Sequence, residues 1–323
     1  MLSLRDTNIL KGIALLLLLA HHLFYVRNGL YSDVNIYHHF YLAHQVGLYG
    51  KLCVAIFVFL SGYGLTVKTE KDGGIKNLKS FYLHRFRKLY LNYWYIWLLF
   101  VPVSYFVFGR TFSAVYHDAI PFKLLLDFLG LLNCAGLYGY NATWWFMSCI
   151  ILLYLLYPLL YRLTRSNWPV AITLAVAITF LPIMNVVNPI RYYVITFVLG
   201  IVYALNPKFT PPGKFGTIFI FLLFLVLSVC RIFGNPILID CALSLLLVHL
   251  YTQVKIPDIL SKCLEFIGRH SMNIFLFHTF IYYYWFREII YAPRNPVVIY
   301  AILLAVCLFV SFAIEKLKTS IIH

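Results

Sequence analysis

A lysine and a histidine lie eleven positions apart in an apolar segment near the start of the chain, at Lys11 and His22. Because a helix turns about 100° and rises about 1.5 Å per residue, the two side chains would share one face and lie about 16 Å apart along the axis. His21 would point about 80° away from Lys11. A neutral imidazole in this position could act as a general base or as a nucleophile. The alternative is a histidine whose hydrogen bonds are satisfied by a neighbouring helix.

The depth of His22 favours a functional role. If Lys11 lies at the cytoplasmic headgroup level, His22 lies beyond the middle of a hydrocarbon core roughly 30 Å thick. Ionisable groups at such a depth are costly and usually functional. We therefore predict that His22 takes part in chemistry inside the membrane.

The composition is that of an integral membrane protein. Of the 323 residues, 62% are hydrophobic and 11% are charged, and no soluble core could bury so much apolar surface. The net charge of +15 comes from Lys and Arg in short loops between apolar runs, which argues against nucleic-acid binding. The seven cysteines form no CxxC pair, so neither a disulfide framework nor a zinc site is indicated. The first apolar run lacks a small-residue cleavage site and is predicted to be a retained span.

Ten apolar runs predict an all-α, polytopic fold with about ten transmembrane helices in a single domain over residues 1–323. They fall at about 8–26, 47–67, 87–108, 142–161, 168–186, 190–205, 215–232, 237–252, 271–287 and 296–315.

An eleventh run, Leu124 to Leu137, is shorter and carries Asp127 and Asn133, so we expect a re-entrant or interfacial segment there. Ten spans with both termini in the cytoplasm place 18 of the 26 Lys and Arg residues inside, Lys208 and Lys214 among them. An eleventh span would move several of these basic residues outside, against the usual bias of cytoplasmic loops.

Two loops are candidates for binding. The first outside loop, residues 27–46, is rich in Tyr and His and contains His38, His39 and His44. These histidines lack the regular spacing of metal ligands, so we expect no metal and interpret the loop as a wet aromatic rim that meets a sugar. The inside loop, residues 68–88, ends in Arg85, Phe86, Arg87 and Lys88, and positive-inside anchoring alone could explain its charge.

Together these residues resemble the acyltransferase-3 group of polytopic membrane acyltransferases, from Arg5 to the last helix. The family's first-helix pattern is a basic residue, ten residues and a histidine, which Lys11 and His22 fit, and this selects His22 over His21. Three further patches follow in the family's order: residues 54–63, which end in Leu-Ser-Gly-Tyr; Trp144-Trp145-Phe146 with Tyr154 and Pro158; and residues 267–271 with His278.

The sequence departs from the family pattern in three places. The family's Arg-x-x-Arg at the start of the third helix is Arg85-Phe86-Arg87-Lys88 here, so a lysine replaces the second arginine and offers a point charge in place of a planar fork. An acidic residue that some members carry after the tryptophans is missing at residues 148–151. The chain also ends after the tenth span, so we expect the transfer to be completed within the membrane domain or with a separate partner.

The resemblance implies an acyltransferase that uses cytoplasmic acyl-CoA, most simply acetyl-CoA, and acylates a hydroxyl of a cell-surface or lipid-linked glycan. His22 would be catalytic, and Lys11, Arg85, Arg87 and Lys88 would bind the polyanionic donor. The oligomeric state is left open. Supporting and acceptor-side roles are expected for Ser61, Tyr63, Trp145 and His278, and for His38, His39 and His44, respectively.

Two other classes of protein remain compatible with the sequence. A glycolipid or solute transporter would also have basic inside loops, an intramembrane histidine and a Tyr-rich outer mouth, and consumption of acetyl-CoA would exclude it. A non-catalytic membrane scaffold would leave His22 without a role, so that replacing it would change only stability.

Overall fold

The computed structural model describes residues 2–181, 188–206, 213–233 and 236–322. Apart from one short hairpin, the elements in these ranges are helical. The first half of the chain comprises α1 (Leu4–Phe24), β1 (Asn35–Tyr37), β2 (Phe40–Tyr41), α2 (Leu42–Gly50), α3 (Leu52–Lys71), α4 (Leu78–Phe106), α5 (Phe112–Tyr116), α6 (Ile120–Phe128) and the 3-10 turns η1 (Leu132–Ala135) and η2 (Ala142–Trp144). The second half comprises α7 (Trp145–Ser166), α8 (Trp168–Phe180), α9 (Asn188–Leu205), α10 (Gly213–Phe233), α11 (Pro236–Gln253), α12 (Asp258–Arg269), α13 (Ser271–Thr279), the π-helix η4 (Phe280–Trp285), α14 (Arg287–Tyr291) and α15 (Pro296–Ile322).

The predicted multi-pass, all-α architecture is confirmed. Within the described residues, five helical stretches are long and apolar enough to cross a membrane, namely Leu4–Phe24, Leu42–Lys71, Ala142–Ser166, Phe215–Ile232 and Pro296–Ser320. The other expected runs correspond to α4, α8, α9, α11 and the continuous α13–η4 segment. Residues 182–186 of the fifth run, the expected inside cation Lys208 and the side chain of Lys214 lie outside the described part of the chain.

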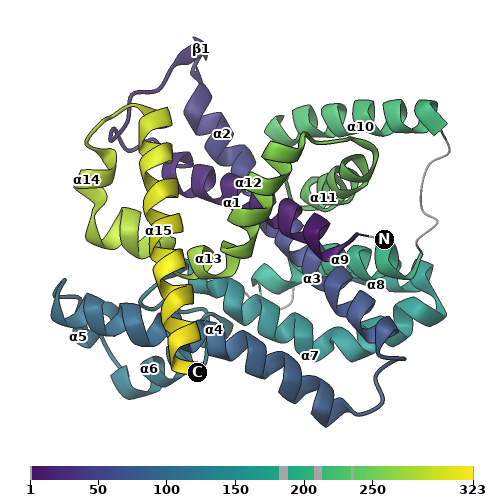
Figure 1. The fold of residues 1–323 in the computed structure, drawn as a ribbon, viewed down its shortest axis with the longest axis horizontal. Coiled ribbons are helices and arrows are strands. Elements are labelled where there is room, and N and C mark those ends of the chain that lie inside the picture. Colours follow the sequence, from purple (N-terminus) through teal and green to yellow (C-terminus); the bar gives the residue numbers. More distant parts are fainter. Residues whose placement is uncertain (1, 182–187, 207–212, 234–235, 323) are drawn as a thin grey trace.

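Helix α1 lies at the centre of the molecule and contacts α2, α3, α12, α13 and α15 (Figure 1). It begins with a capping box, in which the Ser3 side chain accepts from the Asp6 N–H and the Asp6 side chain accepts from the Ser3 N–H. Two glycines then allow α12 to cross it closely. A Cβ at Gly12 would overlap the carbonyl oxygen of Leu264, and one at Gly268 would overlap that of Asn8.

Helix α2 starts earlier than the apolar run predicted. The loop expected at residues 27–46 ends at Tyr41, because the Asp33 carboxylate accepts the backbone N–H groups of Ala43 and His44 at 2.8 and 2.9 Å and so caps the helix. From there α2 runs back along α1, and Gly47 and Gly50 let the two backbones approach. The second expected span is therefore α2 and α3 in sequence, joined at Lys51.

The short eleventh segment does not span, as expected. Helix α6 ends at Phe128, and the carbonyls of Phe128 and Leu129 accept hydrogen bonds from Trp94 and Tyr90, which lie midway along α4. The Asp127 carboxylate, which made this run unlike a span, accepts from the Tyr116 hydroxyl at 2.6 Å and from the Tyr140 N–H at 3.1 Å. Its partners thus flank the segment on either side and tie its two ends together.

Candidate active site

The structure brings two of the predicted site histidines together. His22 lies in the last turn of α1 and His278 lies near the end of α13, and their ring centroids are 4.8 Å apart. Tyr25 and Tyr282 complete the ring cluster, each with a centroid 6.3 Å from that of His22. A candidate reaction centre thus lies between two helices that are distant in sequence.

The two imidazoles differ in their hydrogen bonds. His278 is fully buried, and its Nδ1 lies 2.9 Å from the Ile274 carbonyl oxygen and 3.1 Å from that of Phe275. Because carbonyl oxygens only accept, Nδ1 carries the proton and Nε2 keeps its lone pair. The His22 ring is only half-buried, and neither of its nitrogens has a hydrogen-bond partner among the described residues. His22 is therefore free to meet a reacting group.

His21 is tied to the scaffold. Its Nδ1 lies 2.8 Å from the carbonyl oxygen of Gly47, where α2 packs on α1. Its ring stacks on Tyr25, with centroids 4.9 Å apart. These contacts give His21 a structural part in holding α2 against α1.

The helix that carries His278 is fixed by Trp144, of the family-like Trp-Trp-Phe patch, and by Asn141, which the sequence did not single out. The Leu276 carbonyl oxygen accepts from Asn141 Nδ2 at 2.9 Å and from Trp144 Nε1 at 2.8 Å. It is available because the Phe280 N–H bonds to the carbonyls of Phe277 and His278 where the π-helix begins. Asn141 and Trp144 therefore brace α13 two residues before His278.

A series of side-chain contacts connects Asn141 to His278. The Asn141 Oδ1 atom accepts from the Thr143 hydroxyl at 2.7 Å. The Thr279 hydroxyl lies 3.4 Å both from the Thr143 hydroxyl and from His278 Nε2. A chain of buried polar groups thus ends at the second imidazole.

The predicted donor-binding cations Lys11 and Lys88 lie about 16 to 18 Å from this centre, measured along their helices. Lys88 lies close enough to Lys11 for the two charges to interact. Phe100 of α4 stacks on Phe277, one residue before His278, and Lys88 lies twelve residues earlier, or about 18 Å along the helix. Lys11 lies about 16 Å before His22. The two cations therefore share a depth, as the two histidines do.

None of the four predicted donor-binding side chains has an ion-pair partner within the described residues. Arg85 and Lys11 are half-buried, whereas Arg87 and Lys88 are exposed. Arg85 lines a pocket of about 370 Å³ between the end of α3 and the start of α4, together with Lys68, Lys76 and His84. Lys68 is already paired with Asp72 at 2.7 Å, and this bond holds the pKa of the Asp72 carboxyl below its usual value. The remaining cations are free to meet an anion.

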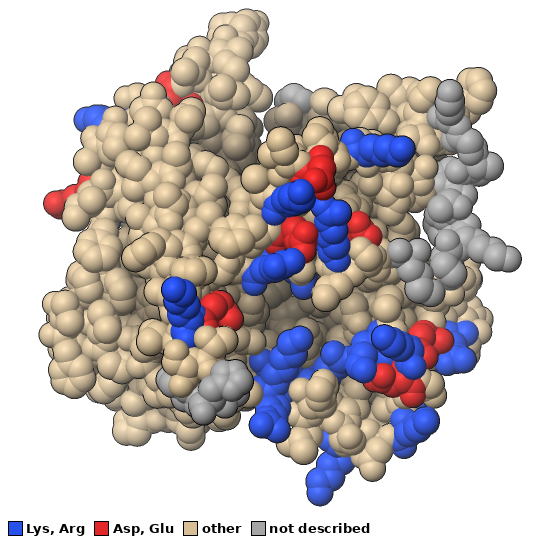
Figure 2. All heavy atoms as spheres, viewed as in Figure 1, with Lys and Arg blue, Asp and Glu red and all other residues tan. Residues whose placement is uncertain are grey.

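Figure 2 shows how these charges are distributed on one face of the molecule. Lys and Arg side chains gather around a central hollow, some over α12 and others where α3 and α4 meet. The α12 group includes Arg5, Lys262 and Arg269, which pair with Asp258 and Glu265. Lys11 of α1 and Arg85, Arg87 and Lys88 of α4 have no ion-pair partner within the described residues.

The other expected supporting residues have structural contacts. Ser61 lies in α3 near the Tyr154 side chain of α7. The Tyr63 hydroxyl accepts from the Leu2 N–H at 2.7 Å and so fixes the start of α1. Trp145 stacks on Tyr193, with centroids 5.9 Å apart. Trp144, its neighbour, is the tryptophan that reaches the His278 helix.

Of the expected acceptor-side histidines, His44 lies apart from His38 and His39. His44 Nδ1 lies 3.2 Å from the Phe24 carbonyl oxygen, at the end of α1. His38 and His39 form the exposed turn between β1 and β2, with φ of 33° and 70°. The described residues contain no cluster of three or more His, Cys, Asp and Glu side chains suited to a metal.

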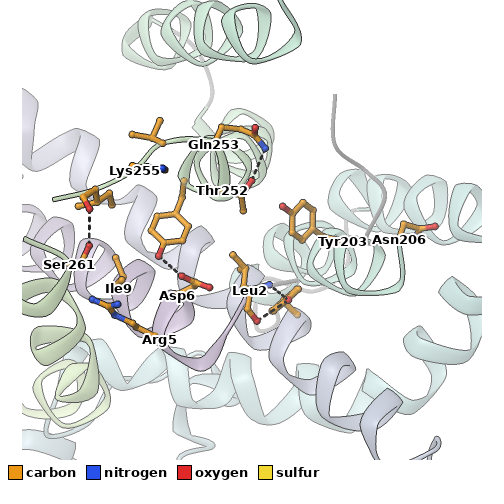
Figure 3. A pocket seen from close by; sticks show the side chains of 14 residues that line it. Leu2, Arg5, Asp6, Ile9, Tyr203, Asn206, Thr252, Gln253, Lys255 and Ser261 are labelled. Atoms are coloured by element: carbon orange, nitrogen blue, oxygen red, sulfur yellow. Dashed lines mark hydrogen bonds between the residues drawn. The ribbon is translucent and has the colours of Figure 1, made fainter. Parts of the chain in front are cut away.

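A second pocket, of about 600 Å³, opens beside the start of α1 (Figure 3). It is lined by Arg5, Asp6, Ile9, Tyr203 and Lys255, among others. Asp6 and Ile9 project about 140° and 160° away from Lys11 around the helix. The Asp6 carboxylate accepts a hydrogen bond from the Tyr251 hydroxyl at 2.6 Å. This pocket is therefore separate from the Lys11–His22 face.

Comparison with known proteins identifies a family across nearly the whole chain. A family model described as an acyltransferase domain matches residues 5–316. Searches of curated proteins and of solved structures gave no significant match.

Proposed function

Because the chain belongs to the acyltransferase-3 family of membrane-bound acyltransferases, we propose that it moves an acetyl group from cytoplasmic acetyl-CoA to a hydroxyl of a cell-surface or lipid-linked glycan. The observation that carries the proposal is the unpaired His22 imidazole, beside His278 and about 16 Å along one helix face from unpaired cations. Acyl transfer from acetyl-CoA needs a base beside the reacting carbonyl and a separate cationic site that binds the phosphates of CoA.

The donor binds at the basic end of this face. Lys11, Arg85, Arg87 and Lys88 bind phosphate groups of CoA through charge-assisted hydrogen bonds. The pantetheine arm then extends along α1 and delivers the thioester to His22. No metal ion or bound cofactor enters this proposal, and acetyl-CoA is a substrate.

The transfer itself needs one proton acceptor. His22 takes the proton of the acceptor hydroxyl, and the oxygen attacks the thioester carbon. A C–O bond forms, the C–S bond breaks, and the departing thiolate takes the proton back from His22. His278 lies against the His22 ring and positions it. In the alternative route His22 itself carries the acetyl group, and an acid quench of a single turnover would reveal acetyl-histidine.

The proposed orientation follows from the same residues. The protein lies in the cytoplasmic membrane with both termini in the cytoplasm, where acyl-CoA is available. His22 then lies in the outer half, and the glycan approaches from the end that carries the β1–β2 hairpin.

Membranes that contain the protein should consume acetyl-CoA and release free CoA in the presence of glycan acceptor. A transporter or flippase for glycolipid would leave acetyl-CoA intact. Membranes with the His22→Ala variant at equal abundance are the control, and equal CoA release from both would overturn the proposal.

A further inference from the structure

The six-residue π-helix that follows His278 carries three consecutive tyrosines, Tyr282, Tyr283 and Tyr284. π-Helical turns are rare and frequently occur at functional sites, because the extra residue redirects side chains from the regular helical positions. Here the redirected residues lie directly beyond the two histidines.

The end of this segment is anchored to other elements. Trp285 Nε1 donates to the Ser104 hydroxyl at 3.0 Å, and the Trp285 ring stacks on Phe100 and Phe108. The Tyr284 hydroxyl accepts from the Ala142 N–H at 3.3 Å. The Arg110 guanidinium lies 3.7 Å from the centre of the Tyr284 ring. Trp285 and Tyr284 are therefore structural residues, whose contacts fix the end of the π-helix.

The Tyr282 ring lies beside the two histidines. Its ring is nearly parallel to that of His278, with centroids 6.0 Å apart and an interplanar angle of 12°. Its centroid lies 6.3 Å from that of His22. Tyr282 is 5% exposed, and its hydroxyl has no hydrogen-bond partner among the described residues. The hydroxyl oxygen is not among the fully buried unpaired atoms, so it is open to solvent or to a reacting group.

Packing alone does not account for this hydroxyl. Phenylalanine would fill the same space and make the same ring contact with His278, so the hydroxyl is not needed for packing. An unpaired donor next to a free base is what an acyl-transfer centre needs, since negative charge develops on the carbonyl oxygen in the transition state.

We propose that Tyr282 is a further catalytic residue, whose hydroxyl donates a hydrogen bond to the oxyanion that forms on the acyl carbonyl. This inference rests on the proposed acyl transfer. The acceptor oxygen adds to the thioester carbon, and the C=O electron pair moves to oxygen and is stabilised by the Tyr282 O–H. The pair returns as the C–S bond breaks, so Tyr282 gains and loses no proton.

The test is the Tyr282→Phe variant, purified in detergent and assayed with acetyl-CoA. Phenylalanine keeps the ring contacts, and Tyr283→Phe, at a side chain 50% exposed, is the matched control. Loss of one oxyanion donor lowers kcat by about 10²-fold. We expect a fall of this size for Tyr282→Phe, with KM for acetyl-CoA unchanged, and no change for Tyr283→Phe.

Slow hydrolysis of acetyl-CoA, with water as the acceptor, gives a second readout that needs no identified glycan. It should fall in Tyr282→Phe by the same factor as transfer. Unchanged kcat would overturn the inference, and so would a rise in acceptor KM with normal hydrolysis, which would make Tyr282 an acceptor-binding residue. Absence of acetyl-CoA turnover by the wild-type protein would instead refute the proposed function.

Discussion

The two adjacent histidines at the end of α1 differ in their hydrogen bonding. His21 is bonded to the Gly47 carbonyl, whereas His22 has no partner among the described residues and faces His278. The sequence favours His22, because helical geometry places it on the Lys11 face and the family pattern selects it, and its catalytic role stays a prediction. It could not predict the bond that occupies His21, since Gly47 belongs to another helix.

At this scale we predict that His22→Ala abolishes acetylation while His21→Ala is milder. Loss of a general base costs about 10²- to 10⁴-fold in rate. Initial rates of acetyl transfer, normalised to the amount of protein in the membrane, measure both variants. Equal retention of activity would contradict the assignment of His22.

The basic residues of α4 give a second prediction. Arg85→Ala and Lys88→Ala should each weaken acetyl-CoA binding by about 1.5 to 3 kcal/mol, because each removes a charge-assisted hydrogen bond. Lys88→Arg should be tolerated. Lys262→Ala is the control, since this lysine is 70% exposed and paired with Asp258. Donor KM or calorimetry gives the affinities, and unchanged values in both alanine variants would leave membrane topology as the only role of the cluster.

At the scale of elements, capping interactions determine where α2 and α4 begin, and long-range hydrogen bonds determine how α13 is held. The apolar pattern of the sequence predicts neither. The ten apolar runs predicted the spans, but α2 begins at Leu42 because Asp33 caps it, and α4 begins at Leu78 because the Asn77 side chain accepts from the Ser80 N–H. The brace on α13 joins residues more than 130 positions apart. An intramembrane Asn next to a Trp pair was the available signal.

This brace predicts different effects for neighbouring tryptophans. Trp144→Phe removes the N–H that binds the Leu276 carbonyl but keeps an aromatic ring, so His278 should lose its fixed position and kcat should fall about 10-fold, in line with the loss of one buried hydrogen bond. Trp145→Phe should have little effect, because Trp145 makes ring contacts with Phe146 and Tyr193 and its indole N–H has no hydrogen-bond partner among the described residues. Steady-state kinetics of the two variants provides the comparison. A larger loss of activity in Trp145→Phe than in Trp144→Phe would contradict the role of the Trp144–Leu276 hydrogen bond in positioning His278.

The crossing of α1 and α12 predicts a stability difference between two glycines. Gly268→Ala should destabilise the protein by about 1 to 3 kcal/mol, since its Cβ has to displace the backbone at Asn8. A Cβ at Gly64 in α3 meets nothing within 4 Å, so Gly64→Ala should leave stability unchanged or slightly raised. Thermal unfolding in one detergent ranks the variants. A Gly268→Ala protein as stable as the wild type would show that the crossing can open at no cost.

For the whole molecule, the central claim is that donor and acceptor approach one reaction centre from opposite ends. The unpaired cations and the histidine pair are separated by about 16 to 18 Å along two helices, α1 and α4. Composition and charge bias predicted this polarity. The pairing of His22 with His278 comes from helix packing, and apolar runs carry little information about which faces meet.

The most direct measurement uses sealed, inverted membrane vesicles, whose cytoplasmic face is outward and which carry the host glycan in the lumen. Acetyl-CoA labelled in the acetyl group is added outside, and labelled glycan is treated with an impermeant esterase before and after detergent is added. We predict that the label becomes glycan-bound and resists the esterase until detergent opens the vesicles, that free CoA stays outside, and that His22→Ala vesicles incorporate no label. Label that the esterase removes before detergent is added would contradict transfer across the membrane, and equal incorporation by His22→Ala would contradict the reaction centre.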